Sequence, residues 1–276
     1  MCTTGVFRLA DGRHAIFKNK DFGRTRLDDL CWVDEERFGV MGMTTWAATG
    51  DEPDRHSGFS IGANRQGLLC CDSNVATLDG FRNYDDLTAI ALSAGGGVPD
   101  AIAAIREVCS VDEVSWANLV MIDGRTAAAV EVRGDRVEVT ELDGPTARSN
   151  HHVRLGWHEL QEDAATTHER LASAQRRIEE VRSVDDVFEL LASHDDGDSG
   201  VCNHSDLTTV YSYVLVVGES TELHVLQGRP CSGAERVSLT VPFASPTSAV
   251  VDGFLAAYPS DDSRNAASVS AQPWVG

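Results

Sequence analysis

Alternating apolar and polar positions at the start of the chain predict a β-hairpin. Residues 3–9 are rich in apolar side chains, residues 10–13 (Ala-Asp-Gly-Arg) supply turn chemistry, and residues 14–18 run back. A second hairpin is predicted within 58–72, with Asn-Arg-Gln-Gly at 64–67 as its turn. Each turn contains a glycine, which tolerates positive φ. The chain thus opens with antiparallel strands, and Cys2 lies at the outer end of the first.

The apolar period lengthens after Tyr84, which predicts helices. One helix starts near Tyr84 and a second at Pro99; later helices are expected at 167–181 and 184–192, with Ser183 as the N-cap of the last. Between and after them, strands are predicted at 119–122, 127–132, 136–142, 210–217, 223–227 and 237–241. This order favours an α+β fold in which two antiparallel sheets pack face to face under helices on both sides.

The sequence contains neither an internal repeat nor a linker between domains. We therefore expect one domain over residues 1–259. Residues 260–276 are rich in Ser, Asp, Asn and Ala and are expected to form a mobile tail.

The composition is acidic, with a formal net charge of −20. Phosphate binding needs a basic surface, so neither nucleic acid nor an anionic membrane is expected as a partner. Only Lys18 and Lys20 are lysines, and the other basic residues are arginines. Acid excess with few lysines is typical of proteins adapted to high salt, where a carboxylate surface stays hydrated and its repulsion is screened. No apolar run is long enough to cross a bilayer, and a cytoplasmic location is expected.

Seven cysteines form no regular framework, so a disulfide scaffold is not expected. Cys202 and His204 flank one asparagine, and His151 and His152 are adjacent. Neither pair has the spacing of a zinc ribbon or finger, so these side chains are expected to fill core or surface and no metal is predicted.

Cys2 is the first candidate for chemistry. A small second residue permits removal of Met1, which would leave a cysteine whose α-amino group adjoins its thiol. The amine titrates near ~7.7–8.0 and the thiol near ~8.5, so the amine can accept the thiol proton. One residue then supplies both nucleophile and base.

Other candidates follow from their positions along the chain. The returning strand of the first hairpin ends in Lys-Asn-Lys-Asp, which brings Lys18 and Asp21 beside Cys2. Asn74 follows the second hairpin, and a side-chain amide can donate to a developing oxyanion. Asn150 offers a second amide, and Arg170 an arginine at a helix start.

Taken together in this order, these residues resemble the choloylglycine hydrolase and penicillin acyltransferase-type families of N-terminal-nucleophile hydrolases. The resemblance covers roughly residues 2 to 231. It rests on the start Cys-Thr-Thr-Gly, the Asn-x-Asp before an aromatic, the Gly-x-Asn-x-x-Gly-Leu hairpin with Asn74 beyond it, Ser-Asn-His at 149–151 and Thr-x-x-Arg at 167–170. Segments 201–204, 209–212 and 227–231 are similar to the C-terminal part of the acyltransferase branch.

The resemblance implies a four-layer αββα fold and attack on an amide through a thioester intermediate, without metal or organic cofactor. Cys2 would attack, Asp21 would order its α-amine, Asn74 and Asn150 would contact the oxyanion and the amine, and Arg170 would stabilise the site electrostatically. The bile-salt branch has an arginine where this chain has Lys18. A flexible ammonium cannot reproduce a bidentate fork, which weakens Lys18 as a substrate-binding residue.

The expected activity is hydrolysis or acyl transfer at the amide of a small acylated amine, in a chain that can associate with itself as family members commonly do. Two alternatives stay open. One is an αββα binding or structural relative with an unreactive Cys2. The other is a metal-binding or thiol-redox protein built on the cysteines and histidines.

Overall fold

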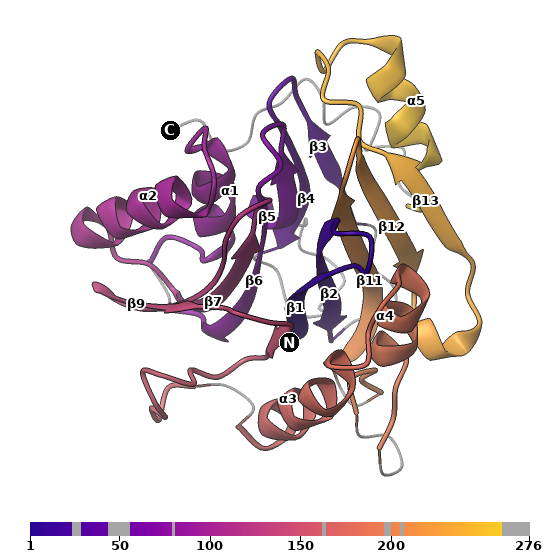
Figure 1. Ribbon diagram of the computed structural model, residues 1–276. Helices are drawn as coiled ribbons and strands as arrows, with labels where there is room; N and C mark the ends of the chain where they lie inside the picture. The colour runs from indigo at the N-terminus through magenta and orange to yellow at the C-terminus, as the bar shows by residue number, and fades with distance from the viewer. Residues whose placement is uncertain are drawn as a thin grey trace.

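The computed structural model describes residues 1–23, 29–43, 56–78, 81–161, 164–195, 200–204 and 207–260. Within these ranges the chain forms two antiparallel sheets (Figure 1). The six-stranded sheet has the order β10-β1-β2-β11-β12-β13. Its strands are β1 (Cys2–Arg8), β2 (His14–Phe22), β10 (Thr146–Arg148), β11 (Thr208–Val217), β12 (Thr221–Gln227) and β13 (Arg236–Thr240).

The seven-stranded sheet has the order β3-β4-β5-β6-β7-β8-β9. Its strands are β3 (Cys31–Val33), β4 (Arg37–Met43), β5 (His56–Asn64), β6 (Leu69–Ala76), β7 (Trp116–Ile122), β8 (Ala127–Arg133) and β9 (Arg136–Glu141). The helices are α1 (Asp85–Ser93), α2 (Val98–Val111), α3 (Ala164–Ile178), α4 (Val184–Leu191) and α5 (Ala249–Ala257).

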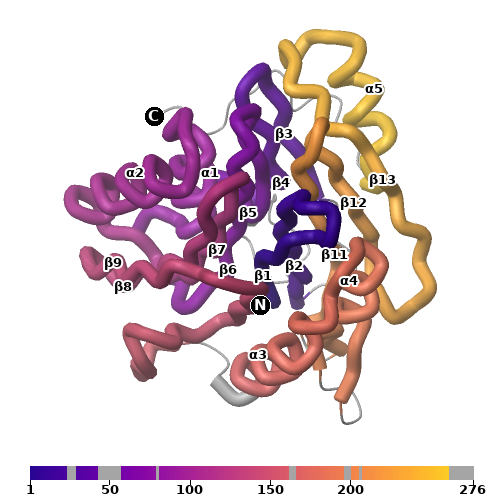
Figure 2. The backbone as a smooth tube through the Cα atoms, in the orientation of Figure 1, coloured from indigo at the N-terminus to yellow at the C-terminus, as the bar shows by residue number. Residues whose placement is uncertain are grey.

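Four layers result from the way these elements bury their apolar faces. Helices α1 and α2 cover the outer face of the seven-stranded sheet, where Leu87 and Ile105 join its buried side chains. Helices α3 and α4 cover the six-stranded sheet, where Leu171 and Leu190 belong to the same buried cluster as Phe17. Figure 2 shows this layering, with β1 and β2 at the centre of the molecule against β6 and β7. The predicted αββα sandwich is confirmed.

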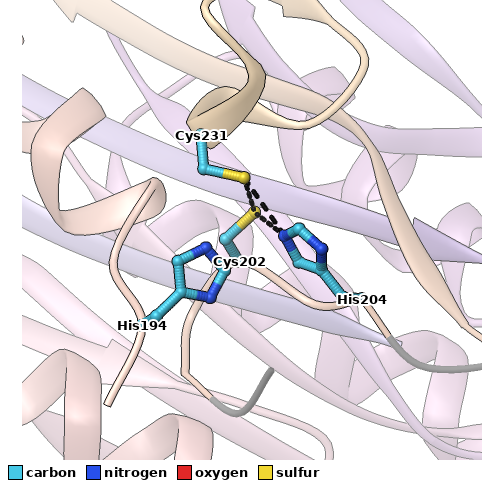
Figure 3. Close-up of side chains that lie close together, drawn as sticks. All are labelled: His194, Cys202, His204 and Cys231. Carbon is cyan, nitrogen blue, oxygen red and sulfur yellow. Dashed lines mark hydrogen bonds between the residues drawn. The ribbon is translucent and has the colours of Figure 1, made fainter. Parts of the chain in front are cut away.

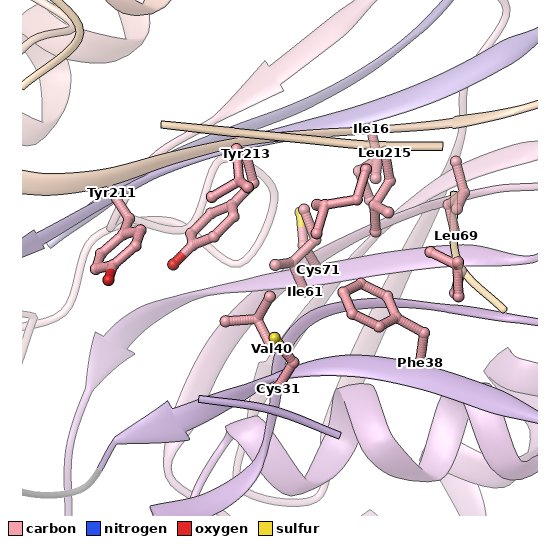
Figure 4. Packing of buried hydrophobic residues seen from close by; sticks show 14 of the residues in the cluster. Ile16, Cys31, Phe38, Val40, Ile61, Leu69, Cys71, Tyr211, Tyr213 and Leu215 are labelled. Atoms are coloured by element: carbon pink, nitrogen blue, oxygen red, sulfur yellow. The ribbon is translucent and has the colours of Figure 1, made fainter. Parts of the chain in front are cut away.

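The space between the sheets holds a core drawn from both of them. In Figure 4, Ile16 and Leu215 of the six-stranded sheet approach Phe38, Ile61 and Leu69 of the other. Because side chains alternate along a strand, the even-numbered positions of β1 and β2 face this core. Cys2, Lys18 and Lys20 therefore lie on the inter-sheet face, and Asn19 and Asp21 lie on the face toward α3 and α4.

Local chemistry explains the confirmed turns and caps. Asn64 closes the β5–β6 hairpin because its Oδ1 accepts from Leu68 N at 2.9 Å, and Gly67 adopts φ 90°. Ser183 caps α4 as predicted: its Oγ accepts from Asp186 N at 3.2 Å, while the Asp186 carboxylate accepts from Ser183 N at 2.8 Å. These contacts satisfy backbone donors that the helix start leaves open.

The sequence pattern missed β3, β4, β10 and α5. Strand β4 contains Gly39 and Gly42, which break an alternating pattern. A Cβ at Gly39 would lie 2.2 Å from the ring of Phe59, so that ring occupies the space of the missing side chain. Residues 261–276 of the tail expected at 260–276 lie outside the described residues. No helix within the described ranges is long and apolar enough to cross a bilayer.

Candidate active site

Cys2 opens β1 and pairs with Lys20 of β2, which lies between β1 and β11. Met1 continues this pairing: its ammonium donates to Asp21 O at 2.9 Å, and Asp21 N donates to Met1 O at 2.8 Å. Met1 is 7% exposed and Cys2 8% exposed. With Met1 in place, the start of the chain is therefore a buried strand end in a fixed register.

Asn150 and Arg170 meet at the backbone of Cys2. The Asn150 Oδ1 accepts from Cys2 N at 2.9 Å and from Arg170 Nη2 at 2.9 Å. Arg170 Nη1 donates to Cys2 O at 2.7 Å. Asn150 Nδ2 donates to Asn74 O at 2.6 Å, which adds Asn74 to the group. Four of the predicted site residues thus lie in one network of hydrogen bonds.

The Ser149 peptide holds Asn150 in this position. Ser149 O accepts from Ser73 Oγ at 2.7 Å and from Asn118 Nδ2 at 2.8 Å. Thr167 Oγ1 accepts from Asn150 N at 2.7 Å. Sequence reasoning quoted Ser149 and Thr167 only as motif positions and did not consider Asn118, which lies inside an apolar strand. A polar residue at an otherwise buried strand position was the signal for it.

The Asp21 side chain is fully buried on the face of β2 that is turned toward α3 and α4. Its Oδ1 accepts from Thr209 Oγ1 at 2.7 Å. Burial raises the pKa of Asp21, while the charges of Arg170 and the N-terminal ammonium oppose that rise. The carboxyl group therefore lies within electrostatic reach of the terminal amine and of Arg170.

Lys18 lies between the sheets, 1% exposed. Its Nζ donates to Ser60 O at 2.9 Å, Asp72 O at 2.8 Å and Asp72 Oδ1 at 3.0 Å. Burial is the largest single influence and lowers the pKa of Lys18, but the charges of Asp72, Cys2, Cys71 and Asp85 together outweigh it and raise that pKa. An ammonium has three donors, so these acceptors use all of them and leave none for a substrate.

A second buried lysine lies two residues further along β2. Lys20 Nζ donates to both carboxylate oxygens of Asp29, at 2.8 and 2.9 Å, and to Met41 O at 3.1 Å. Tyr213 also donates to Asp29. Burial, followed by the charge of Asp29, holds the pKa of Tyr213 well above its usual range. Tyr213 therefore remains a donor that helps Lys20 to balance the carboxylate.

A surface hollow of about 550 Å³ is lined by Trp32, Glu36, Arg37, Leu92 and other residues of that side. None of the predicted site residues lines it. The hollow is thus separate from the network around Cys2.

Several solved structures share this fold. A mutant of the conjugated bile acid hydrolase from Clostridium perfringens aligns over 87% of this chain and 92% of its own, with TM-score 0.55 and 11% identity. Penicillin V acylase from Agrobacterium tumefaciens aligns over 87% of this chain and 86% of its own, with TM-score 0.54 and 13% identity. The Caenorhabditis elegans ortholog of N-acylethanolamine-hydrolyzing acid amidase aligns over 78% and 92%, with TM-score 0.53 and 14% identity.

These likenesses establish the fold, which agrees with the resemblance drawn from the residues. No protein-family model matches the chain, and no curated protein matches it. The roles of the individual residues therefore stay predictions.

Proposed function

We propose that this protein is an amidohydrolase that cleaves the amide of a small acylated amine, with Cys2 as its nucleophile after removal of Met1. The observation that carries the proposal is the contact between Cys2 N and Asn150 Oδ1, joined by Arg170 on both partners. Once Met1 is gone, this nitrogen becomes a free amine. An amide oxygen already at 2.9 Å then holds one of its protons and leaves its lone pair available.

In the proposed acylation step, the Cys2 sulfur forms a bond to the substrate carbonyl carbon, and the thiol proton moves to the Cys2 amine. Charge develops on the carbonyl oxygen, and the Asn74 side-chain amide is the proposed donor to it. The carbon–nitrogen bond then breaks. The leaving amine takes the proton from the Cys2 ammonium, and the acyl group remains as a thioester.

In the second step, water attacks the thioester carbonyl and the Cys2 amine accepts a proton from it. The carbon–sulfur bond breaks, the sulfur takes that proton back, and a carboxylic acid leaves. If an amine replaces water, the same site performs acyl transfer. Two charged side chains assist these steps. Asp21 orients the ammonium that forms on Cys2, and Arg170 holds the Cys2 backbone carbonyl by a hydrogen bond.

Lys18 has a different proposed role from substrate binding. Its donors are all used inside the protein, and its charge couples to the Cys2 thiol. A fixed positive charge on that face is the proposed source of attraction for the negative charge that develops on the Cys2 sulfur during attack. Lys18 thus acts on the nucleophile through space.

Peptide mapping after brief treatment with a limiting thiol alkylator tests the nucleophile. The full chain in high-salt buffer should begin at Cys2, and Cys2 should be alkylated before the other six thiols. A chain that retains Met1, or a Cys2 that reacts no faster than the buried thiols, would remove the amine base and leave a binding protein of the same fold.

A substrate panel then tests the reaction class. It contains a glycine-conjugated bile acid, penicillin V and N-acylethanolamines of several chain lengths, because proteins of this fold are named for such amides. Acid quenching during turnover should trap an acyl group on the Cys2 peptide by mass, and Cys2→Ala should abolish both product and adduct. Equal product release by Cys2→Ala would contradict the mechanism.

A further inference from the structure

Four side chains that the proposed reaction does not use converge beside the six-stranded sheet. His194 follows α4, Cys202 and His204 lie in the segment before β11, and Cys231 lies in the 3-10 helix η1 (Pro230–Ser232) after β12. One ligand atom from each lies within 4.8 Å of the others (Figure 3). Sequence spacing shows only Cys202 and His204 as a close pair and misses His194 and Cys231, because the four members come from three separate segments.

The distances match the edges of a tetrahedral metal site. Zinc bonds of about 2.3 Å to sulfur and about 2.0 Å to nitrogen place two sulfurs about 3.8 Å apart and a sulfur and a nitrogen about 3.5 Å apart. Cys202 Sγ lies 3.5 Å from Cys231 Sγ and 3.6 Å from His204 Nε2. His204 Nε2 lies 3.1 Å from Cys231 Sγ. The separations of these three atoms are therefore close to those expected around one zinc ion.

His194 supplies the fourth corner. Its ring lies edge-on to that of His204 at 4.7 Å between centroids. Its Nδ1 is buried and has no hydrogen-bond partner among the described residues. One ring nitrogen of His194 lies within 4.8 Å of the ligand atoms of the other three residues.

Two thiols 3.5 Å apart could also form a disulfide, but that bond would use neither imidazole. One contact does oppose a metal. The Arg229 guanidinium lies 3.0 Å from His204 Nδ1 and donates to it, which places the ring proton on Nε2. Coordination through Nε2 requires the other tautomer, so Arg229 must turn away. Its side chain is exposed, and such a turn costs little.

The cluster is linked to the proposed active site through the residue between two of its members. Asn203 N donates to Thr209 Oγ1 at 2.9 Å, and Thr209 N donates to Asn203 O at 3.0 Å. The same Thr209 hydroxyl donates to Asp21. A metal that held Cys202 and His204 in place would therefore also hold Asn203 and, through it, the Thr209 hydroxyl that donates to Asp21.

We propose that His194, Cys202, His204 and Cys231 bind one zinc ion. This ion would hold residues 202–204, which support Asp21 through Thr209, in a fixed position. Two thiolates and two imidazoles form a donor set that zinc favours. Four protein ligands leave no open position, so the ion has a structural role and takes no part in the reaction.

Metal analysis of the full-length protein tests the site. The protein should be produced without a histidine tag and purified under reducing conditions without chelator. We expect about one zinc per chain by elemental mass spectrometry, as a closed site of four protein ligands predicts. Replacement by cobalt(II) should give thiolate-to-cobalt charge-transfer absorption and intense tetrahedral ligand-field bands.

Cys231→Ser and His204→Gln should lose the zinc and the charge-transfer pattern, whereas Cys109→Ala, which removes a thiol from α2, should retain both. The cobalt spectrum of the unaltered protein carries the test if a variant does not fold. Absence of zinc and of the cobalt bands in the reduced protein overturns the proposal. So does wild-type zinc content in Cys231→Ser, or a Cys202–Cys231 disulfide whose reduction restores no metal uptake. None of these readouts requires activity, so they are independent of the proposed reaction.

Discussion

Replacing Asp72 by asparagine removes the carboxylate that faces the Lys18 ammonium between the sheets. The Nζ–Oδ1 distance is 3.0 Å, and the two side chains are 1% and 0% exposed. The ammonium keeps its bonds to Ser60 O and to the Asp72 carbonyl, so the loss is that of charge compensation. Removing one partner of a buried pair typically costs about 3–5 kcal/mol.

We expect the stability cost of Asp72→Asn to lie at the lower end of this range, because the nearby carboxyl group of Asp85 can replace part of the lost charge. Burial, followed by the charge of Asp72, holds the pKa of Asp85 well above its usual range, while Lys18 opposes that rise. In Asp72→Asn the repulsion disappears, and Asp85 can ionise to balance Lys18. We therefore expect a loss of about 3 kcal/mol for Asp72→Asn, and a larger loss for Asp72→Asn combined with Asp85→Asn.

Urea unfolding in high-salt buffer measures these free energies in a double-mutant cycle with Lys18→Met. With a denaturant slope of about 2 kcal/mol/M, a loss of about 3 kcal/mol lowers the midpoint by roughly 1.5 M. The double variant should lose about 2 kcal/mol less than the sum of the single losses, because it leaves no uncompensated charge.

The control is the exposed pair of Arg82 and Asp112, at 2.7 Å with side chains 38% and 40% exposed. Asp112→Asn should cost less than about 1 kcal/mol, since water screens the pair. Two results would contradict this reasoning. One is that the stability losses of Lys18→Met and Asp72→Asn add within about 0.5 kcal/mol in the double variant. The other is that Asp72→Asn lowers the free energy of unfolding no more than Asp112→Asn does.

Three further outcomes are expected. Asn150→Asp keeps the acceptor for Cys2 N but loses the donor to Asn74 O, so kcat/KM should fall about 10²–10³-fold with unchanged circular dichroism; near-normal activity would contradict the proposed role of Asn150. Burial, then the charge of His168, lowers the pKa of His151 to about 4, so the stability that the neutral ring contributes is present above about pH 6.5 and lost as pH falls toward 4. Thermal melts of His151→Gln should show a shallower loss over that window, and an equally steep loss would refute this. With a net charge of −20, the melting temperature should rise between low and molar KCl, and a flat or falling trend would exclude salt adaptation.

Much of the fold could be predicted because its elements bury one face and leave local marks. The β5–β6 turn at Asn64 and the cap at Ser183 depend on contacts within a few residues, which a sequence displays directly. Strand β4 could not be predicted, because Gly39 breaks its pattern and the ring of Phe59 on the adjacent strand fills the space of the missing side chain. That compensation exists only after the strands pair.

The candidate site was also predicted only in part from the sequence. The order of Cys2, Asn74, Asn150 and Arg170 was sufficient to expect them together, and they share one network. Lys18 was expected beside Cys2 as a weak candidate for substrate binding, yet its ammonium is bound inside the protein, since its partner Asp72 comes from the other sheet. Of the His194 cluster the sequence showed only the pair Cys202 and His204, because segments distant in sequence bring the other members to them.

The burial of both lysines has a practical consequence. Lys18 and Lys20 are the only lysines of the chain, and with the terminal amino group they account for every primary amine in the sequence shown. Both lysines, and Met1 as well as Cys2, are at most 8% exposed. Amine-directed dyes and crosslinkers should therefore find almost nothing to react with on the folded chain and several sites once it opens. Labelling by such a dye would serve as a low-background reporter of unfolding.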